Sequence, residues 1–394
     1  MSATQSEPRL AQIARARSTL LARGAHPLQP GPPDRDGRDW IRQSWQRCLA
    51  RGAEPERRID FEPVPHLSDK RIRESQRRLL HVANPILQRL ARTIAPLHYF
   101  VLLTDAAGTV IGTAGVDRRL GADARALARV GVDLSEPSVG TTAISGALRE
   151  QRPVWLHRGE HFFSNVGVFS CAGAPLWDPD GQCIGMIDLT GVHAAERPEL
   201  VHLVARYARE VEHALLASTP HALALALSWA PGWQVAGSAD QGLVCSDRDG
   251  CVVGANRVAR QMLPQLQAGR AEGWHLKDLF AVAWTELFDL AASGQGKTIP
   301  LWSGLRVHVS AQRDRSQNPA AGGASGPPGQ PVRPLRAVEA ELVLRAVREA
   351  GGRVDLAARA LGISRATVYR RLRGQRTEPA RARQPDARAG NRRD

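Results

Sequence analysis

The stretch of sequence that most constrains this chain lies near its C-terminus, at residues 335–374. Apolar residues recur there at helical spacing until two glycines, Gly351 and Gly352, end the pattern, because glycine tolerates the left-handed position after a helix. Asp355 is a suitable N-cap for a short second helix that ends at Leu361. The spacing therefore predicts two helices, the second too short to be stable without packing against a neighbour.

A third helix is predicted from Arg365 to Arg373, after a glycine turn and with Ser364 as its N-cap. A short apolar helix, a glycine turn and a basic helix form a helix-turn-helix, whose last helix enters the DNA major groove. The alternative is a helical hairpin with a solvated basic face. The residues predicted to contact DNA lie on or beside the third helix: Ser364, Arg365, Thr367, Tyr369, Arg370, Arg371 and Arg373.

The segment AARALGISRATVYRRLR resembles the DNA-binding end of Fis-type bacterial regulators. That pattern usually has Gly-Asn where this chain has Gly352 and Arg353, a departure that falls in the loop between helices. The resemblance implies double-stranded DNA as a partner. Because one such unit reads only a half-site, a homodimer is expected.

Charge is unevenly distributed along the 394 residues, whose formal net charge is +14. Residues 335–394 hold 15 Arg or Lys against 7 Asp or Glu, and residues 1–98 hold 18 against 10, whereas the middle is nearly neutral. Basic ends around near-neutral domains suit a polyanionic partner. The length allows two or three domains.

The spacing of the cysteines bears on the cellular compartment of the protein. The five are scattered without a Cys-x-x-Cys pair, so neither a disulfide framework nor a zinc finger is indicated, and a reducing cytoplasm is predicted. The first residues lack an apolar signal core, and no apolar run approaches the roughly 20 residues of a membrane span. No membrane association and no cofactor are expected.

Residues 1–98 are predicted to form an N-terminal helical segment. A short helix is expected from Ala11 to Ala22, and another around Trp45, whose apolar neighbours recur every four residues. Leu67–Ile94 is predicted as one long helix, which we hypothesise pairs with its twin in a dimer.

Residues 99–191 show mainly strand signals. A hairpin opens the segment, three more strands follow, and the last two of these are joined by the Asp-Pro-Asp-Gly turn at residues 178–181. A helix is expected from Thr141 to Glu150. Strands that follow one another as hairpins, with segregated helices, predict an α+β domain.

The stretches SEPSVGTTAISGAL, RPVWLHRGEHF, SCAGAPLWDPDG and GMIDLTG, with SWQRC before them, resemble the GAF sensor domain of acetoin-catabolism-type activators. The resemblance covers residues 38–191 and implies a pocket for a small organic effector. Such pockets have apolar walls with a few polar groups, although aromatic residues of this kind also fill ordinary cores. The residues predicted to form the wall are Tyr99, Trp155, His161, Phe162, Phe169 and Cys171.

A metal site is an alternative for the same segment, because imidazole and thiolate bind zinc or iron well. The candidates are His157, His161 and Cys171, but their spacing matches no dense ligand motif. No metal is therefore predicted.

Residues 192–231 are predicted to be connecting helices, one from Arg197 to Ala217 and another formed by ALALALSW. Residues 232–312 begin with a strand, an Asp-Arg-Asp-Gly turn, a strand and a helix. This order resembles the opening of a PAS-type domain, and a further helix and two strands are expected to complete it.

The segment AASGQGKT, Ala291–Thr298, fits a loose nucleotide-binding pattern. A phosphate loop needs a strand before it and a helix after it, whereas here an apolar helix is expected before it and a strand after it. An ATP site is therefore rejected. Residues 313–334 form a Pro/Gly-rich flexible linker where acetoin-type activators carry the ATPase that remodels sigma-54 polymerase, and residues 375–394 form a basic disordered tail.

These features together predict a multidomain α+β chain: a GAF-like antiparallel-sheet sensor, a PAS-like α+β domain and a C-terminal all-α helix-turn-helix. The predicted function is effector-controlled, sequence-specific DNA binding without ATP-driven sigma-54 activation. One alternative is an adaptor that binds RNA polymerase or another partner and uses DNA as a tether. Another is a catalytic central domain, but no paired carboxylates, nucleophile elbow or metal motif supports an enzyme.

Overall fold

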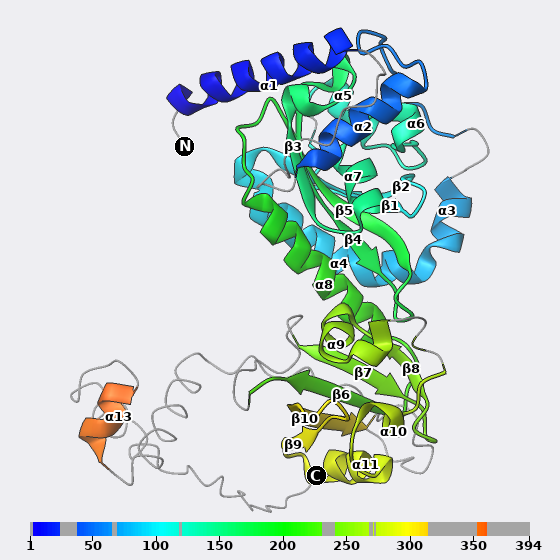
Figure 1. Cartoon of the computed structure of the whole chain (residues 1–394), viewed down its shortest axis with the longest axis vertical. Coiled ribbons are helices and arrows are strands. Elements are labelled where there is room, and N and C mark those ends of the chain that lie inside the picture. The colour runs from blue at the N-terminus through cyan, green and yellow to red at the C-terminus, as the bar shows by residue number, and fades with distance from the viewer. Residues whose placement is uncertain are drawn as a thin grey trace, which may run out of the picture. The chain divides into compact units, whose positions relative to one another are not determined.

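The computed structural model describes residues 3–23, 38–64, 69–117, 120–230, 241–267, 271, 273–313 and 353–360. The chain divides into two compact units, residues 1–317 and residues 318–394. The first unit contains two five-stranded antiparallel sheets (Figure 1). The description of the second unit is confined to helix α13 (Val354–Ala360) and the residue before it.

The first sheet has the strand order β2-β1-β5-β4-β3, with every neighbouring pair antiparallel. The predicted hairpin and the three later strands are all present, and the turn at residues 178–181 joins the last two. The strands are β1 (Tyr99–Asp105), β2 (Val110–Ala114), β3 (Val154–His157), β4 (Phe169–Trp177) and β5 (Cys183–Val192).

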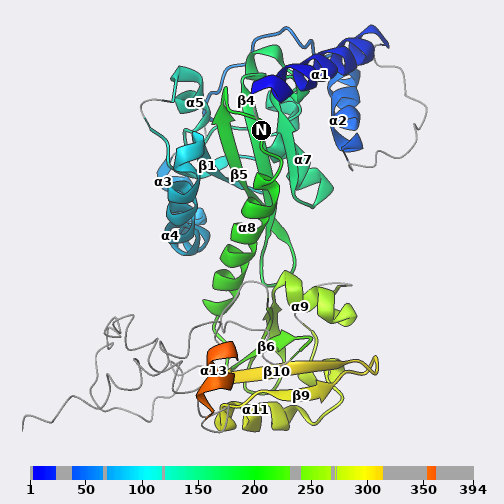
Figure 2. The ribbon, with the colours of Figure 1, turned by 90° about the vertical axis from the view of Figure 1, so that its left-hand side faces the viewer.

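Helices cover both faces of this sheet. The long amphipathic helices α4 (Arg77–Ile94) and α8 (Leu200–Ala217) pack on one face. Helices α2 (Asp39–Ala50) and α7 (Ala143–Glu150), with the short helices α5 (Ala122–Leu127) and α6 (Glu136–Val139), lie against the other. Figure 2 shows α4 and α7 on opposite sides of the strands. Because both faces are covered, the central strands are buried along almost their whole length.

The first helices differ in length from those predicted. Helix α1 (Ala3–Arg23) contains the predicted helix and extends it at its N-terminus. The single helix predicted at Leu67–Ile94 is wrong, because α3 (Asp69–Ser75) and α4 are separated at Gln76, whose φ is −103° and ψ is 15°. The Ser75 hydroxyl donates to the Ile72 carbonyl, the kind of local side-chain bond that competes with a helix.

The second sheet has the strand order β8-β7-β6-β10-β9. Its first strand lies in the segment ALALALSW, so the helix predicted there is wrong. Leu223, Leu225 and Leu227 are fully buried and alternate with half-buried small residues, which is the period of a strand that buries one face. The strands are β6 (Leu223–Ser228), β7 (Gly242–Ser246), β8 (Val252–Ala255), β9 (Lys297–Pro300) and β10 (Arg306–Arg313).

Helices α9 (Arg257–Met262), α10 (Leu276–Leu279) and α11 (Trp284–Ser293) contribute to the core of the second sheet. The predicted order of strand, turn, strand and helix is confirmed by β7, β8 and α9. Strand β6 precedes that order along the chain and is central to the sheet. The assignment of this domain as PAS-like stays a prediction. The remaining elements are the 3-10 helices η1 (Ala95–Leu97), η2 (Arg158–Glu160), η3 (Ser164–Val166) and η4 (Pro264–Gln267).

The loop that matches a nucleotide-binding pattern has the predicted surroundings. Within the segment Ala291–Thr298, α11 ends at Ser293, Gly294 adopts a left-handed conformation with φ 64°, and β9 begins at Lys297. The Lys297 ammonium lies 3.4 Å from the Glu286 carboxylate. Since a helix precedes the loop and a strand follows it, no helix N-terminus is available there for a phosphate.

Two further observations concern the length of the described helices and the start of α13. None of the helices in the described ranges is long and apolar enough to cross a membrane. Helix α13 begins one residue before Asp355, so Asp355 lies in its first turn and its prediction as the N-cap is wrong.

Candidate ligand-binding site

The first sheet encloses a small cavity on the face covered by α2 and α7. Strands β1, β4 and β5 form its floor, and α5, α6, α7 and the loops around them close it. Its free volume is about 20 Å³, room for about one water molecule. The lining residues are Phe61, Leu102, Leu127, Leu134, Val139, Thr142, Ala143, Ile144, His161, Val166, Phe169, Cys171, Asp188 and Thr190.

Asp188 is the most unusual residue of this lining, since it is a fully buried carboxyl in the middle of β5. The Thr190 hydroxyl donates to its Oδ2, and its Oδ1 has no hydrogen-bond partner. Burial raises the pKa of Asp188 to about 7, opposed by the bond from Thr190. A buried polar atom without a partner is costly, so Oδ1 is a ready acceptor for a ligand.

His161 and Cys171 complete the polar edge of the cavity. The His161 Nδ1 lies 2.8 Å from the Arg158 carbonyl and donates to it, which leaves Nε2 as an acceptor. That Nε2 lies 3.8 Å from the Cys171 sulfur. Burial lowers the pKa of His161 to about 4 and raises the pKa of the Cys171 thiol. Both groups are therefore neutral at physiological pH, and the cavity offers polar contacts without a cationic side chain.

The structure separates the six aromatic, histidine and cysteine residues predicted as a pocket wall. His161, Phe169 and Cys171 line the cavity. Phe162 is fully buried just behind it, edge-to-face with Trp45 at 5.3 Å between ring centroids. Contact of these residues with an effector stays a prediction.

Tyr99 and Trp155 lie on the other face of the sheet, packed with the α4 and α8 core, so they do not line this cavity. The Tyr99 hydroxyl donates to the Ala195 carbonyl at 3.1 Å, and the Arg38 guanidinium lies 3.5 Å from the Trp155 ring centroid. The reason is strand parity, because neighbouring residues of a strand point to opposite faces.

The three candidate metal ligands do not converge. The His157 Nδ1 lies 2.7 Å from the Ser170 hydroxyl, and strand alternation places Ser170 on the face opposite Cys171. Within the ranges that the structure describes, no three His, Cys, Asp or Glu side chains are placed to hold a metal ion.

Sequence reasoning missed Asp188, Thr190, Thr142 and Phe61 as lining residues. A signal for Asp188 was available, since it is an acidic residue inside the apolar run of β5, where a charged side chain has no solvent-exposed face. Phe61 carries no such signal, because only the fold brings it against Phe169, 6.3 Å away between ring centroids.

Two of the sequence stretches that indicated a GAF sensor hold the cavity wall in place. Glu136, from SEPSVGTT, accepts two hydrogen bonds from Arg47 at 2.8 and 2.6 Å and one from Ser44 at 2.8 Å, both in SWQRC. Burial opposes the charge on Glu136, but these bonds lower its pKa overall. Gly146 allows α2 and α7 to approach closely, since a Cβ there would lie 2.4 Å from the Trp40 ring. These residues frame the cavity without lining it.

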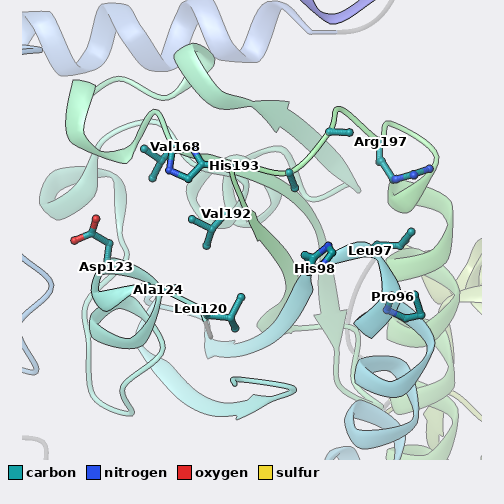
Figure 3. A pocket seen from close by; sticks show the side chains of 13 residues that line it. Pro96, Leu97, His98, Leu120, Asp123, Ala124, Val168, Val192, His193 and Arg197 are labelled. Carbon is teal, nitrogen blue, oxygen red and sulfur yellow. The ribbon is translucent and has the colours of Figure 1, made fainter. Parts of the chain in front are cut away.

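An open groove of about 570 Å³ lies beside the enclosed cavity (Figure 3). Helix α5 contributes to both, with Ala124 in the groove and Leu127 in the cavity. His98 and His193 both line the groove. Their backbones are in the left-handed region, with φ 60° and 49° respectively. Figure 3 shows Asp123 and Arg197 far apart at its ends, and its polar side chains do not converge. The enclosed cavity is therefore the better candidate for a specific ligand site.

The seven residues predicted to contact DNA, Ser364 to Arg373, lie outside the described residues. Their placement on a recognition helix stays a prediction.

Comparison with known proteins covers both ends of the chain. The family described as MimR, N-terminal domain, matches residues 8–212. The family described as bacterial regulatory protein, Fis family, matches residues 334–373.

Three relatives are named as regulators. The acetoin catabolism regulatory protein of Cupriavidus necator is 31% identical over 232 residues, 57% of this chain and 34% of that protein. The propane 2-monooxygenase operon transcriptional activator MimR of Mycolicibacterium smegmatis is 32% identical over 198 residues, 49% of this chain and 31% of that protein. The acetoin dehydrogenase operon transcriptional activator AcoR of Bacillus subtilis is 28% identical over 183 residues, 45% of this chain and 30% of that protein.

The matched part of this chain thus spans about a third of the length of each of these relatives. Among solved structures, the Escherichia coli DhaR(N)–DhaL complex aligns with a TM-score of 0.43 and 15% identity, covering 70% of this chain and 100% of that one.

Proposed function

The chain belongs to the family defined by the MimR N-terminal domain and carries a Fis-family segment at residues 334–373, and from that premise we propose that it is a sequence-specific DNA-binding transcriptional regulator controlled by a small effector. The three relatives described above are named as transcriptional regulators and activators. The observation that carries the proposal is the cavity of the first sheet, with its unpaired Asp188 oxygen, in a chain that ends in a Fis-family segment.

The effector proposed for this cavity is a small neutral molecule that forms hydrogen bonds. Asp188 Oδ1 accepts from a hydroxyl, His161 Nε2 is a second acceptor, and the other walls are mostly apolar. An anionic ligand would meet no opposite charge there. Acetoin, in the names of two relatives, is a small hydroxyketone, and oxidation of propane at its second carbon yields a small alcohol. Such molecules exceed the volume of one water, so the cavity has to widen to admit them.

The remaining parts of the proposal are carried over from the sequence predictions. We propose from the sequence that residues 232–312 are a PAS-like domain and that residues 313–334, nearly all outside the described residues, are a linker in place of an ATPase, so that regulation does not use ATP-driven sigma-54 activation. A flexible tether transmits no torque, but it sets the effective concentration of two half-site binders in a homodimer. The effector therefore acts on dimer geometry. The location expected for such a regulator is the cytoplasm.

The DNA-binding part of the proposal is tested by a gel-shift titration of the full chain at several salt concentrations. Changing Arg370 and Arg373 together to Ala should weaken binding and flatten the dependence of affinity on salt, because fewer counterions are released. The matched control changes Arg381 and Arg383, in the basic tail, to Ala. Equal losses from the two pairs would indicate unspecific attraction to DNA, as the adaptor alternative expects.

The effector-binding part is tested by calorimetry with acetoin as the probe. Asp188→Asn should weaken binding by about 1–3 kcal/mol, the cost of leaving buried hydrogen-bonding groups mismatched. Tyr99→Phe, which removes a hydroxyl on the opposite face of the same sheet, is the control and should leave affinity unchanged. Equal affinity of the wild type and Asp188→Asn would place the effector elsewhere.

A further inference from the structure

Helix α1 is attached to the sensor at few points. Of its side chains between Arg9 and Ala22, only Ile13 is buried, against Gly159, while Leu21 is half-buried against the core of the cavity face. A hollow of about 340 Å³ separates much of the helix from α2. The attachment therefore lacks the continuous apolar stripe that holds α4 and α8 to the sheet.

Ion pairs form much of the rest of the attachment. Arg9 lies 2.8 Å from Glu160 and 3.1 Å from Glu196, and its side chain is 28% exposed. Glu160 also pairs with Arg38 and accepts a hydrogen bond from the His157 amide at 2.7 Å. Partly exposed ion pairs contribute little net stability, so such an attachment is reversible.

Arg17 differs from the other attachments because it binds the wall of the cavity. Its guanidinium donates to the carbonyl oxygens of His161 at 2.8 Å and Phe162 at 3.0 Å, and to the Ser164 hydroxyl at 2.9 Å. The guanidinium also lies 4.7 Å from the Trp45 ring centroid. One side chain of α1 thus fixes three polar groups of the segment that runs from the end of η2 to the start of η3.

The loop that Arg17 binds has the cavity on its other side. The His161 imidazole lines the cavity, while the His161 carbonyl accepts from Arg17. The free volume inside is about 20 Å³. An effector larger than a water molecule has to displace part of the wall, and outward movement of this loop stretches the hydrogen bonds to Arg17.

We propose that α1 is an intramolecular lock, which holds the effector cavity closed through the hydrogen bonds of Arg17 to the His161–Ser164 loop. Effector binding and docking of α1 then oppose each other. By linkage, effector binding releases α1 by the same factor by which release of α1 tightens effector binding. The proposal rests on the effector site proposed above.

The first test needs no effector, since it measures access to the cavity in the full chain. Cys171 lines the cavity, and its rate of alkylation by iodoacetamide, followed by mass spectrometry of its peptide, reports opening. Arg17→Ala should raise that rate about tenfold, a typical coupling. Cys245, buried in the second sheet, is the internal control for global unfolding.

Arg15→Ala is the matched variant, because Arg15 is an exposed arginine of the same helix. It should leave the Cys171 rate at the wild-type value. An unchanged Cys171 rate in Arg17→Ala would refute the lock, and so would a parallel rise at Cys245, because both sheets would then be opening together.

The second test uses acetoin with the same three proteins. Arg17→Ala should bind acetoin about tenfold more tightly than the wild type or Arg15→Ala. Acetoin should also speed hydrogen exchange of the α1 amides in the wild type. Weaker binding by Arg17→Ala, or slower α1 exchange, would overturn the proposal. If the wild type binds no acetoin, the proposed effector fails, whereas the alkylation test still decides the lock.

Discussion

The two sheets of the first unit have the same number of strands and the same antiparallel pairing, but they are buried differently. Helices cover both faces of the first sheet, so β1 and β5 are buried along nearly every residue. In the second sheet, β6 and β10 alternate between buried and half-buried or exposed residues, and one large core lies on one face. In the first sheet, the helices over the cavity face keep Asp188 fully away from water.

Two buried polar residues, Asp188 in the first sheet and Asn256 beside the second, show a further contrast. Asn256, before α9, accepts from the Leu243 and Ala259 amides at 2.9 and 2.8 Å and donates to the Gln241 carbonyl at 2.7 Å. Asp188 has one oxygen bonded and the other without a partner. A satisfied polar group stabilises a fold, whereas an unsatisfied one facing a cavity indicates a ligand site.

The largest expected effect separates the cores of the two sheets. Phe162→Ala should lower the free energy of unfolding by about 3–5 kcal/mol, because a fully buried ring between Trp45 and Phe163 leaves a cavity. Phe280→Ala, equally buried in the second core, should cost a similar amount. Urea unfolding measures both, and native-state hydrogen exchange should localise each loss to its own sheet. Losses spread over both sheets would make them one cooperative unit.

Asn256→Ala is expected to cost about 2–4 kcal/mol, since three backbone groups lose their partner and α9 loses its cap. Urea unfolding is again the measurement. The control Gln312→Ala, at an exposed position of β10, should change stability by less than about 0.5 kcal/mol. A small loss at Asn256 would mean that water replaces its bonds, and the contrast with Asp188 would disappear.

The pH dependence of stability tests Asp188. Its pKa is raised from 3.8 to about 7 by burial, so between these values the folded chain binds more protons than the unfolded chain. The contribution of Asp188 therefore makes the fold less stable as pH rises through that window. Between about pH 6 and about pH 8 the loss is about 1 kcal/mol, and Asp188→Asn should abolish it. Thermal unfolding of both proteins at the two pH values provides the comparison, and parallel pH profiles would contradict the assignment.

The smallest effect is expected at an exposed residue of the turn between β9 and β10. Trp302 is 64% exposed, and its indole donates to the Lys277 carbonyl at 2.8 Å. Trp302→Ala should change the unfolding free energy by less than about 0.5 kcal/mol. A substantially larger loss in chemical denaturation would show that this residue is covered in solution.

The sequence by itself determined the strands and turns of the first sheet, because alternation and the turn at residues 178–181 are local properties. It also indicated the family, since SWQRC and SEPSVGTT occur in order along the chain. It misassigned the segment of β6 because a run of Leu and Ala has high helix propensity, while partners in β7 and β10 favour the strand.

The tertiary structure alone decided which residues meet at the cavity. Strand alternation sorts side chains into two sets, but it does not say which set faces α7 and which faces α8. That choice removed Tyr99 and Trp155 from the predicted site and brought in Asp188. The contact of Arg17 with the His161 carbonyl joins residues 144 positions apart. No local pattern encodes such a pair, because packing of the whole chain determines it.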